Sequence, residues 1–257
     1  MKINRKKVNG LIVIIVFFAI WEAASRLELV NRMLLPPVSE VLIAVDGLTA
    51  NGKLISHIFL SLGRAMSGLF MAILIAVPAG VLTGGLSRRF QLMLEPVVEF
   101  LSQLNPFVLY HLILIFLGIG EVTKVTLITW ACIWPVLFST ISGVCHMEPL
   151  YIKLANAFKL NRRQMTVKVI IPAALPQILY GIRMSAGYSF FMLIAAEMMG
   201  GESGLGFLIV FSQRFYQVRN VYALVLVIAV LGVIMDGILD LLENKCLNRY
   251  YQEDHNV

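Results

Sequence analysis

Residues 150–176 read LYIKLANAFKLNRRQMTVKVIIPAALP, a polar and basic stretch in a chain that is otherwise strongly apolar. It carries five cations and no acidic residue, and the cations are Lys153, Lys159, Arg162, Arg163 and Lys168. A cationic segment between apolar segments is typical of the cytoplasmic side of a membrane protein. The stretch therefore predicts a loop exposed to the inner aqueous phase.

The first half of this loop predicts a short helix with a small, apolar tip. The tip is formed by Leu154, Ala155, Ala157 and Phe158, and the surrounding residues are polar. We expect Asn161 to end this helix, because asparagine tolerates a left-handed backbone. An exposed apolar tip of this kind indicates a surface that docks into a groove of another protein.

The composition of the whole chain points to a bilayer as its solvent. Of its 257 residues, 59% are hydrophobic and 14% are charged, and the mean hydropathy is +0.83. A soluble domain of this size is far less apolar. The net charge of +6 comes without the interleaved aromatic residues that favour nucleic-acid binding. The cysteines and histidines have no metal-ligand spacing, so we expect no metal site.

Apolar runs predict an all-α integral membrane protein with six transmembrane helices in a single domain, 1–257, whose core covers about 58–247. The expected spans are about 8–25, 58–86, 90–117, 122–144, 169–199 and 221–242. The N-terminal run could also be a signal peptide, but Glu22 interrupts the cleavage-like region, so we favour an uncleaved helix. Gly80 and Gly84 have the spacing that lets a second helix approach closely, while Pro96 and Pro106 predict kinks in the third span.

The distribution of cations orients these spans. Thirteen lysines and arginines lie in the segments expected inside and six in those expected outside. This excess predicts that both termini are cytoplasmic.

Several motifs carry a resemblance to a known family. Small residues near Ala155, a turn near Lys159 and then Pro172 resemble the coupling motif of binding-protein-dependent ABC importer permeases. The match continues outside the loop in the motifs Leu35-Pro-Pro-Val-Ser-Glu40, Phe116-Leu-Gly-Ile-Gly-Glu121, Pro172-Ala-Ala-Leu-Pro176, Gly181-Ile-Arg183, Ala195-Ala-Glu197-Met and Ser203-Gly-Leu-Gly-Phe207. These are similar to the nitrate, sulfonate, taurine and bicarbonate branch.

The resemblance implies a type I importer permease with a cytoplasmic coupling helix at about 149–165. It also implies a bacterial inner-membrane assembly of two permease copies, two ATP-binding subunits and an extracytoplasmic solute-binding protein. ATP and Mg²⁺ would be bound by the partner subunits, so this chain would hold no cofactor and catalyse no reaction. The implied coupling residues are Leu154, Ala155, Asn156, Ala157, Phe158, Lys159, Asn161 and Arg162.

Two departures from the family pattern affect these expectations. The family usually has an acid at position 153 and glycine at position 159, where this chain has lysines. We therefore expect the turn after the coupling helix to shift to Asn161. Before Gly118 the family tends to show several prolines, whereas this chain has Gln103, Asn105 and His111.

The candidate residues for the pathway or its gate are Asn105, His111, Glu197, Gly204 and Gly206. His111 is either bonded to a neighbouring carbonyl or in contact with the solute. Glu197 forms either a structural ion pair or part of the external gate, and Gly204 and Gly206 indicate a close turn beside it.

The expected function is passage of a small solute, with nitrate, a sulfonate such as taurine or a similar small anion favoured by the resemblance. A vitamin precursor such as a pyrimidine is the alternative solute. A secondary transporter would show two related halves, and an intramembrane enzyme would need a cluster of reactive side chains. The sequence shows neither feature.

Overall fold

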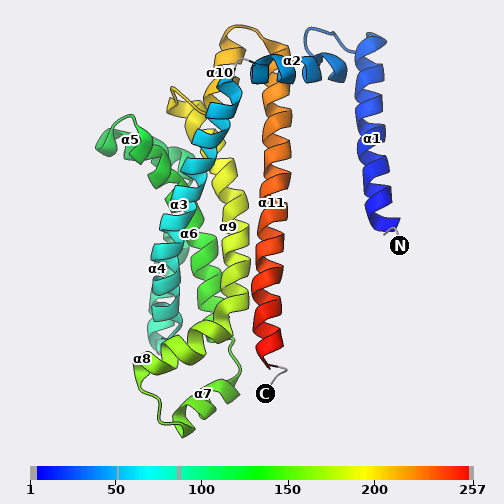
Figure 1. The fold of residues 1–257 in the computed structure, drawn as a ribbon. Helices are drawn as coiled ribbons and strands as arrows, with labels where there is room; N and C mark the ends of the chain where they lie inside the picture. Colours follow the sequence, from blue (N-terminus) through cyan, green and yellow to red (C-terminus); the bar gives the residue numbers. More distant parts are fainter. Residues whose placement is uncertain (1–4, 51, 86–87, 255–257) are drawn as a thin grey trace.

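Three long helices form the centre of the molecule. The computed structural model describes residues 5–50, 52–85 and 88–254, and the described residues contain helices but no strand. Helices α3 (Lys53–Gly84), α6 (Glu121–Cys145) and α9 (Ile171–Gly200) pack side by side, as Figure 1 shows. The predicted all-α class is thereby confirmed.

Small residues let these three helices approach closely. A Cβ atom on Gly80 would lie 2.6 Å from Cβ of Thr140, and one on Gly84 would lie 2.7 Å from Cβ of Val144. The predicted close approach at this glycine pair is therefore confirmed, and α6 is the neighbour. Gly181 brings α9 onto α6 in the same way. Without a hydrophobic driving force inside a bilayer, such close contacts between backbones hold helices together.

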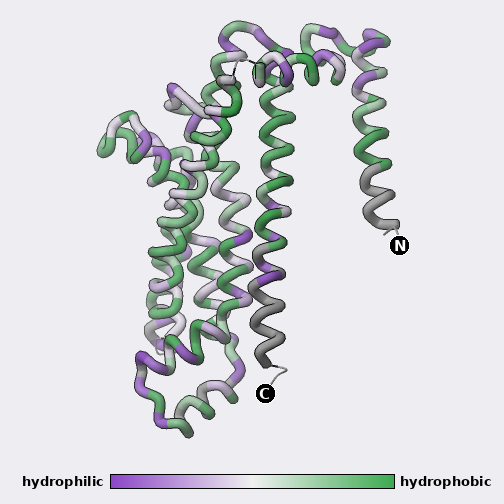
Figure 2. Tube along the Cα trace, in the orientation of Figure 1, coloured by the Kyte–Doolittle hydropathy of each residue, from purple (hydrophilic) through white to green (hydrophobic). Residues whose placement is uncertain are grey.

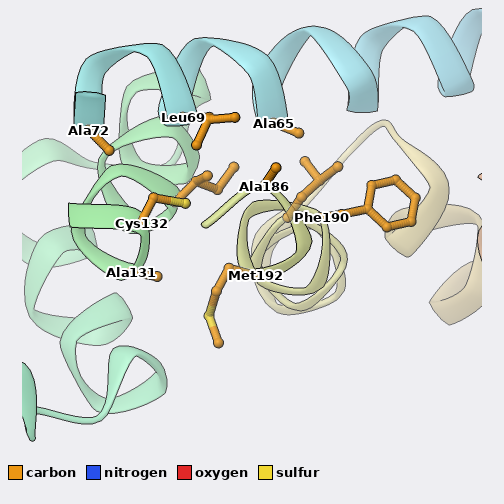
Figure 3. Packing of buried hydrophobic residues seen from close by; sticks show 10 residues of the cluster. Ala65, Leu69, Ala72, Ala131, Cys132, Ala186, Phe190 and Met192 are labelled. Atoms are coloured by element: carbon orange, nitrogen blue, oxygen red, sulfur yellow. The ribbon is translucent and has the colours of Figure 1, made fainter. Parts of the chain in front are cut away.

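The main apolar cluster lies where the three helices meet (Figure 3). Each helix contributes small and medium side chains, and the labelled members are Ala65, Leu69, Ala72, Ala131, Cys132, Ala186, Phe190 and Met192. The alanines keep the helices close while the larger residues fill the spaces between them.

The predicted third span is broken rather than kinked. Helix α4 (Arg88–Ser102) ends before Asn105, and α5 (Pro106–Leu117) continues at an angle of 83° to it. The side chain of Asn105 accepts a hydrogen bond from the backbone N–H of Phe107 at 2.9 Å, and Pro106 occupies the first position of α5. An N-cap followed by proline starts a new helix, which explains why one continuous span was the wrong expectation.

The predicted fifth span begins with a change of helix type. Helix α8 (Arg162–Met165) leads into a π-helical turn, η1 (Thr166–Ile170), and then into α9. Pro172 lacks a backbone N–H and crowds the preceding turn, and a π-helical turn accommodates such a disruption.

The remaining helices lie around and at the ends of the bundle (Figure 1). Helices α2 (Val38–Ala50) and α10 (Leu205–Arg214) lie at one end, and α7 (Pro149–Ala157) lies at the other. Helix α11 (Val218–Asp254) runs beside α9. Helix α1 (Arg5–Arg26) stands apart and is tied through Trp21, whose indole N–H donates to the carbonyl of Pro36 at 3.0 Å.

Within the described residues, four helices are long and apolar enough to cross a membrane, and the bent α4–α5 pair makes five if it counts as one span. The four are α3, α6, α9 with the turns before it, and α11 up to Leu241. Figure 2 shows hydrophobic residues along these helices and hydrophilic ones mainly at the ends. The predicted first span, 8–25, lies in α1, whose side chains before residue 12 lie outside the described part, so this span stays a prediction.

Candidate functional site

The predicted coupling segment, residues 149–165, forms the end of the molecule opposite α2 and α10 (Figure 1). Helix α7 ends where the backbone N–H of Leu160 bonds to the carbonyl of Ala155 at 3.1 Å, and Lys159 has the left-handed φ of +50°. The expected shift of this turn to Asn161 is wrong. The left-handed position is residue 159, the position at which the resembling family usually has glycine.

Asn161 has a different role, because it begins α8. Its side-chain oxygen accepts from the backbone N–H of Gln164 at 2.8 Å, and the side chain of Gln164 accepts from the backbone N–H of Asn161 at 3.1 Å. This reciprocal pair is a capping box, which satisfies two amides that a helix start leaves without partners.

The predicted apolar tip is only partly exposed. Phe158 is 76% exposed and Leu154 is 47% exposed, and Ala157 is exposed as well. Ala155 is 2% exposed, so its place in an exposed tip was wrongly predicted: it faces Val169 and the start of α9 across a cavity of about 250 Å³. The side chains of Asn156 and Arg162, also predicted to couple, lie outside the described part.

Around this tip the surface is cationic. Lys153, Lys159, Arg163 and Lys168 are exposed, and among the described side chains no carboxylate pairs with any of them. A basic rim around an apolar tip suits a partner groove that is apolar at its centre and acidic at its edge.

At the other end of the bundle lies a buried ion pair. Arg64 of α3 is 4% exposed and Glu197 of α9 is fully buried, and the guanidinium Nη1 lies 2.6 Å from the carboxylate Oε1. The same carboxylate accepts from the hydroxyl of Ser61 at 2.8 Å. It also accepts from the backbone N–H of Gly206 at 3.0 Å. Of the two roles left open for Glu197, the geometry fits the ion pair.

Arg64 connects further elements to this pair. Its Nη2 donates to Glu121 Oε1 at 2.6 Å, and Lys124 Nζ lies 3.1 Å from the same oxygen. Arg64 also donates to the carbonyl and the hydroxyl of Ser203, at 2.9 and 2.8 Å. The Arg64 cluster, defined here as Ser61, Arg64, Glu121, Lys124, Glu197 and Ser203, thus joins α3, α6, α9 and the loop before α10.

Charge balance explains how such a cluster is tolerated at membrane depth. Arg64 and Lys124 offset Glu121 and Glu197, and each of the two buried cations has a carboxylate within 3.1 Å. Ionisable side chains in membrane spans are costly unless they pair or face a cavity. Only Glu121 is substantially exposed, at 59% of its side chain.

The loop before α10 needs its glycines. Gly204 has φ +110°, and a Cβ atom there would overlap the carboxylate of Glu197. A Cβ on Gly206 would lie 2.5 Å from the carbonyl oxygen of Ile194. The backbone N–H of Gly204 donates to Nδ1 of His57 at 2.8 Å. The close turn expected here is present and is held against Glu197.

Asn105 and His111, the other two predicted pathway residues, lie on the broken span. Both are exposed, and Asn105 acts as the cap described above. Nδ1 of His111 lies 3.1 Å from the carbonyl of Phe107, the local bond that was one of its two expected roles. Within the described part, neither is hydrogen-bonded to the Arg64 cluster.

Most of the Arg64 cluster was not predicted from the sequence. An arginine at position 64, inside an apolar run, was the available signal, because an ionisable residue within a span indicates a functional or tightly paired site. The described residues contain no group of three His, Cys, Asp or Glu side chains that could hold a metal ion. The described residues thus combine an exposed basic segment at one end of the bundle with a loop held by a buried ion pair at the other.

Comparison with known proteins agrees with this geometry. The family described as binding-protein-dependent transport system inner membrane component matches residues 76–247. A putative aliphatic sulfonates transport permease of Bacillus subtilis (strain 168) is 32% identical over 93% of this chain and 86% of its own length. The taurine transport system permease of Escherichia coli (strain K12) is 33% identical over 86% of this chain and 82% of its own.

Solved structures show the same fold. A methionine ABC transporter in inward-facing conformations superposes with a TM-score of 0.64 at 16% identity, covering 79% of this chain and 98% of that chain. An amino acid ABC transporter gives 0.62 at 16% identity, covering 78% and 97%. The family match, the relatives and the shared fold lead to one conclusion: this chain belongs to the binding-protein-dependent transport system inner membrane components, the permease subunits of ABC importers.

Proposed function

We propose that two copies of this chain form the pathway of an ATP-driven importer for a small anion. An extracytoplasmic binding protein delivers the solute, and two ATP-binding subunits dock onto α7 and the loop that follows it. Both termini of the chain are cytoplasmic. The sulfonate and taurine permeases named above, together with a bicarbonate permease of Synechococcus elongatus that is 30% identical over 68% of this chain, support a small anion as the solute.

The observation that carries this proposal is the surface of the coupling segment. Phe158 presents 76% of its surface at the end of a bundle whose helices are otherwise suited to lipid. Phe158, Leu154 and Ala157 together form an exposed apolar patch with a cationic rim, and such patches mark sites that bind another protein. The chain itself contains no GxxxxGK[ST] phosphate-binding sequence, so the energy for pumping comes from that partner.

Docking at Phe158 is tested by shortening its side chain. In the complex co-expressed with its ATP-binding subunit, Phe158→Ala should cut co-purification of that subunit about tenfold or more, since a central aromatic anchor contributes about 2 kcal/mol or more to an interface. The remaining complex should hydrolyse ATP without importing taurine into proteoliposomes that contain the binding protein.

Phe116→Ala is the matched control, because Phe116 is 83% exposed on α5, away from the coupling segment. This variant should keep the ATP-binding subunit bound. Full recovery of the subunit and full import by Phe158→Ala would show that the ATP-binding subunit docks elsewhere.

A further inference from the structure

A small cavity lies between the outer end of α9 and the helix α10. Its volume is about 140 Å³, and its walls include Met198 and Met199 at the end of α9 and Phe207, Phe211 and Arg214 on α10. Arg214 therefore lines a cavity whose other side chains are mainly those of methionine and phenylalanine.

Arg214 differs from the other described arginines at this end of the molecule in its charge partners. The others each pair with a carboxylate: Arg26 with Glu22, Arg32 with Glu40, Arg64 with Glu121 and Glu197, and Arg219 with Glu40. Among the described residues, Arg214 has no carboxylate within ion-pair distance. Its charge is therefore available to an anion that enters the cavity.

The acid that lines the same cavity does not cancel this charge. Glu197 contributes to the wall, but its carboxylate is bonded to Arg64, Ser61 and the backbone of Gly206. Since Arg64 already offsets Glu197, the cavity retains the positive charge of Arg214.

The cavity adjoins a larger apolar groove. Met198 and Met199 line both, and the groove encloses about 620 Å³ over the face of α9, between Phe107 of α5 and Ala229 of α11. The cavity and the groove are thus neighbours on α9.

The geometry points to Arg214 as an anion-recognition residue at the outer mouth of the pathway. The inference rests on the proposed function as an importer and assigns its solute a first contact on this chain. The guanidinium holds the anionic head, because its planar fork matches the oxygens of a sulfonate or carboxylate. The short apolar part of the solute packs against Met198 and Phe211.

The exposure of Arg214 suits a transit site. A pathway must bind its solute strongly enough to admit it and weakly enough to release it. An exposed guanidinium pays little desolvation cost and gives a modest attraction, unlike the buried and fully paired Arg64. Arg214 thus recognises the anion, whereas Arg64 supports the loop before α10.

The test uses a reactive probe that is itself a small aliphatic sulfonate. A single cysteine replaces Met198 in full-length protein in which Cys132, Cys145 and Cys246 are changed to serine, assembled with its ATP-binding subunit. The rate of reaction with sulfonatoethyl methanethiosulfonate is compared with that of the cationic trimethylammonioethyl reagent. For charges about 7 Å apart in water, Arg214→Gln should slow the anion about threefold and speed the cation about threefold, so that the ratio falls about tenfold.

Two controls isolate the effect of Arg214. Arg219→Gln removes a nearby arginine that pairs with Glu40 at 2.8 Å, and it should leave the ratio at position 198 nearly unchanged. A reporter cysteine at Ile119, which is 74% exposed outside the cavity, should keep its ratio in Arg214→Gln. Arg214→Lys should preserve most of the preference for the anionic reagent.

The outcomes separate this inference from the proposed function. An unchanged ratio at position 198 in Arg214→Gln overturns the anion site, even if the complex still imports taurine. If the ratio falls as expected while the wild-type complex imports none of taurine, nitrate and bicarbonate with their binding proteins, the anion site stands and the proposed solute class fails. If Arg214→Gln lowers the ratio of the two reaction rates equally at position 119, the effect comes from the overall surface charge and not from the cavity. This result also overturns the inference.

Discussion

Replacing Arg64 with methionine isolates the energetic role of the buried ion pair. Methionine keeps an unbranched apolar chain of similar length but removes the cation from Glu197, which is fully buried. Glu197 would keep its bonds to Ser61 and to the backbone of Gly206. Two neutral donors cannot offset the charge of a carboxylate that water does not reach.

The expected loss follows from removing one partner of a buried pair. Such a change costs about 3–5 kcal/mol, mainly because an uncompensated charge stays behind. The loss of the bonds from Arg64 to Ser203, at 2.8 and 2.9 Å, acts in the same direction. We expect Arg64→Met to destabilise the protein by about 4 kcal/mol, and the double variant Arg64→Met with Glu197→Leu to recover more than half of that loss.

The assay is thermal denaturation of the purified complex in detergent, followed by the fraction that remains monodisperse. A loss of about 4 kcal/mol should lower the midpoint by roughly 10 °C. Arg26→Met is the matched control, because Arg26 pairs with Glu22 on the surface with 65% of its side chain exposed. Exposed pairs contribute at most about 1 kcal/mol, so this variant should melt within a few degrees of the wild type.

Two results would refute this reasoning. One is an Arg64→Met protein as stable as the Arg26→Met control, since the carboxylate would then have found water or a proton without cost. The other is a double variant no more stable than the single one, because the loss would then come from packing around Arg64 and not from an unpaired charge.

Two further predictions concern the coupling segment and the orientation of the chain. Lys159→Gly should relieve a left-handed residue at φ +50° by about 1 kcal/mol and slow hydrogen exchange at the amide of Leu160 a few-fold; faster exchange would contradict the strain. A cysteine at Leu29, which is 74% exposed, should react with an impermeant maleimide in intact cells, whereas one at Arg163 should react only after lysis. Reaction at position 163 from outside would reverse the proposed topology.

The packing of the bundle could be predicted from local sequence, because glycine spacing acts within one helix. Gly80 and Gly84 lie one turn apart and therefore face the same neighbour, whatever that neighbour is. That α6 is this neighbour was not predicted, because it depends on how distant spans pack against each other. The position of Pro106 likewise predicted a disturbance in the third span.

The size of that disturbance depended on one further residue. Proline alone kinks a membrane helix and leaves it continuous, but Asn105 caps the next helix and Pro106 starts it, which turns the chain by 83°. Asparagine followed by proline indicates the start of a new helix. The length of the apolar run alone predicted one continuous span, and this start signal was not used.

In the coupling segment, Asn161 could either adopt the left-handed turn or cap the start of α8. Asn161 was expected at the left-handed turn, but Gln164 stands three residues later, which is the spacing of a capping box. Two reciprocal hydrogen bonds outweigh the strain of about 1–2 kcal/mol at Lys159. The partner of Glu197 could not be derived in this way, because Arg64 is 133 residues distant and only the packing of α3 on α9 brings them together.

The two ends of the molecule are linked by the same two helices. The coupling segment leaves α6 at Cys145 and enters α9 through α8 and η1. At the opposite end of the bundle, Glu121 lies at the start of α6 and Glu197 near the end of α9, and Arg64 bonds to both. Between these ends, a Cβ on Gly181 would lie 2.6 Å from Cβ of Ser139, so α6 and α9 pack in close contact there.

We expect a displacement of α7 to move α6 and α9 together, because close-packed interfaces shift between discrete arrangements and do not deform smoothly. Helix α5 meets α6 and α9 through Tyr110, which is buried against Leu127 and Ala196, whereas its His111 and Phe116 are exposed. The groove lined by Phe107 lies along the boundary between α9 and α5. Opening and closing of the pathway is thus expected at that boundary, where a movement of α9 changes the width of the groove without breaking the bonds of Arg64.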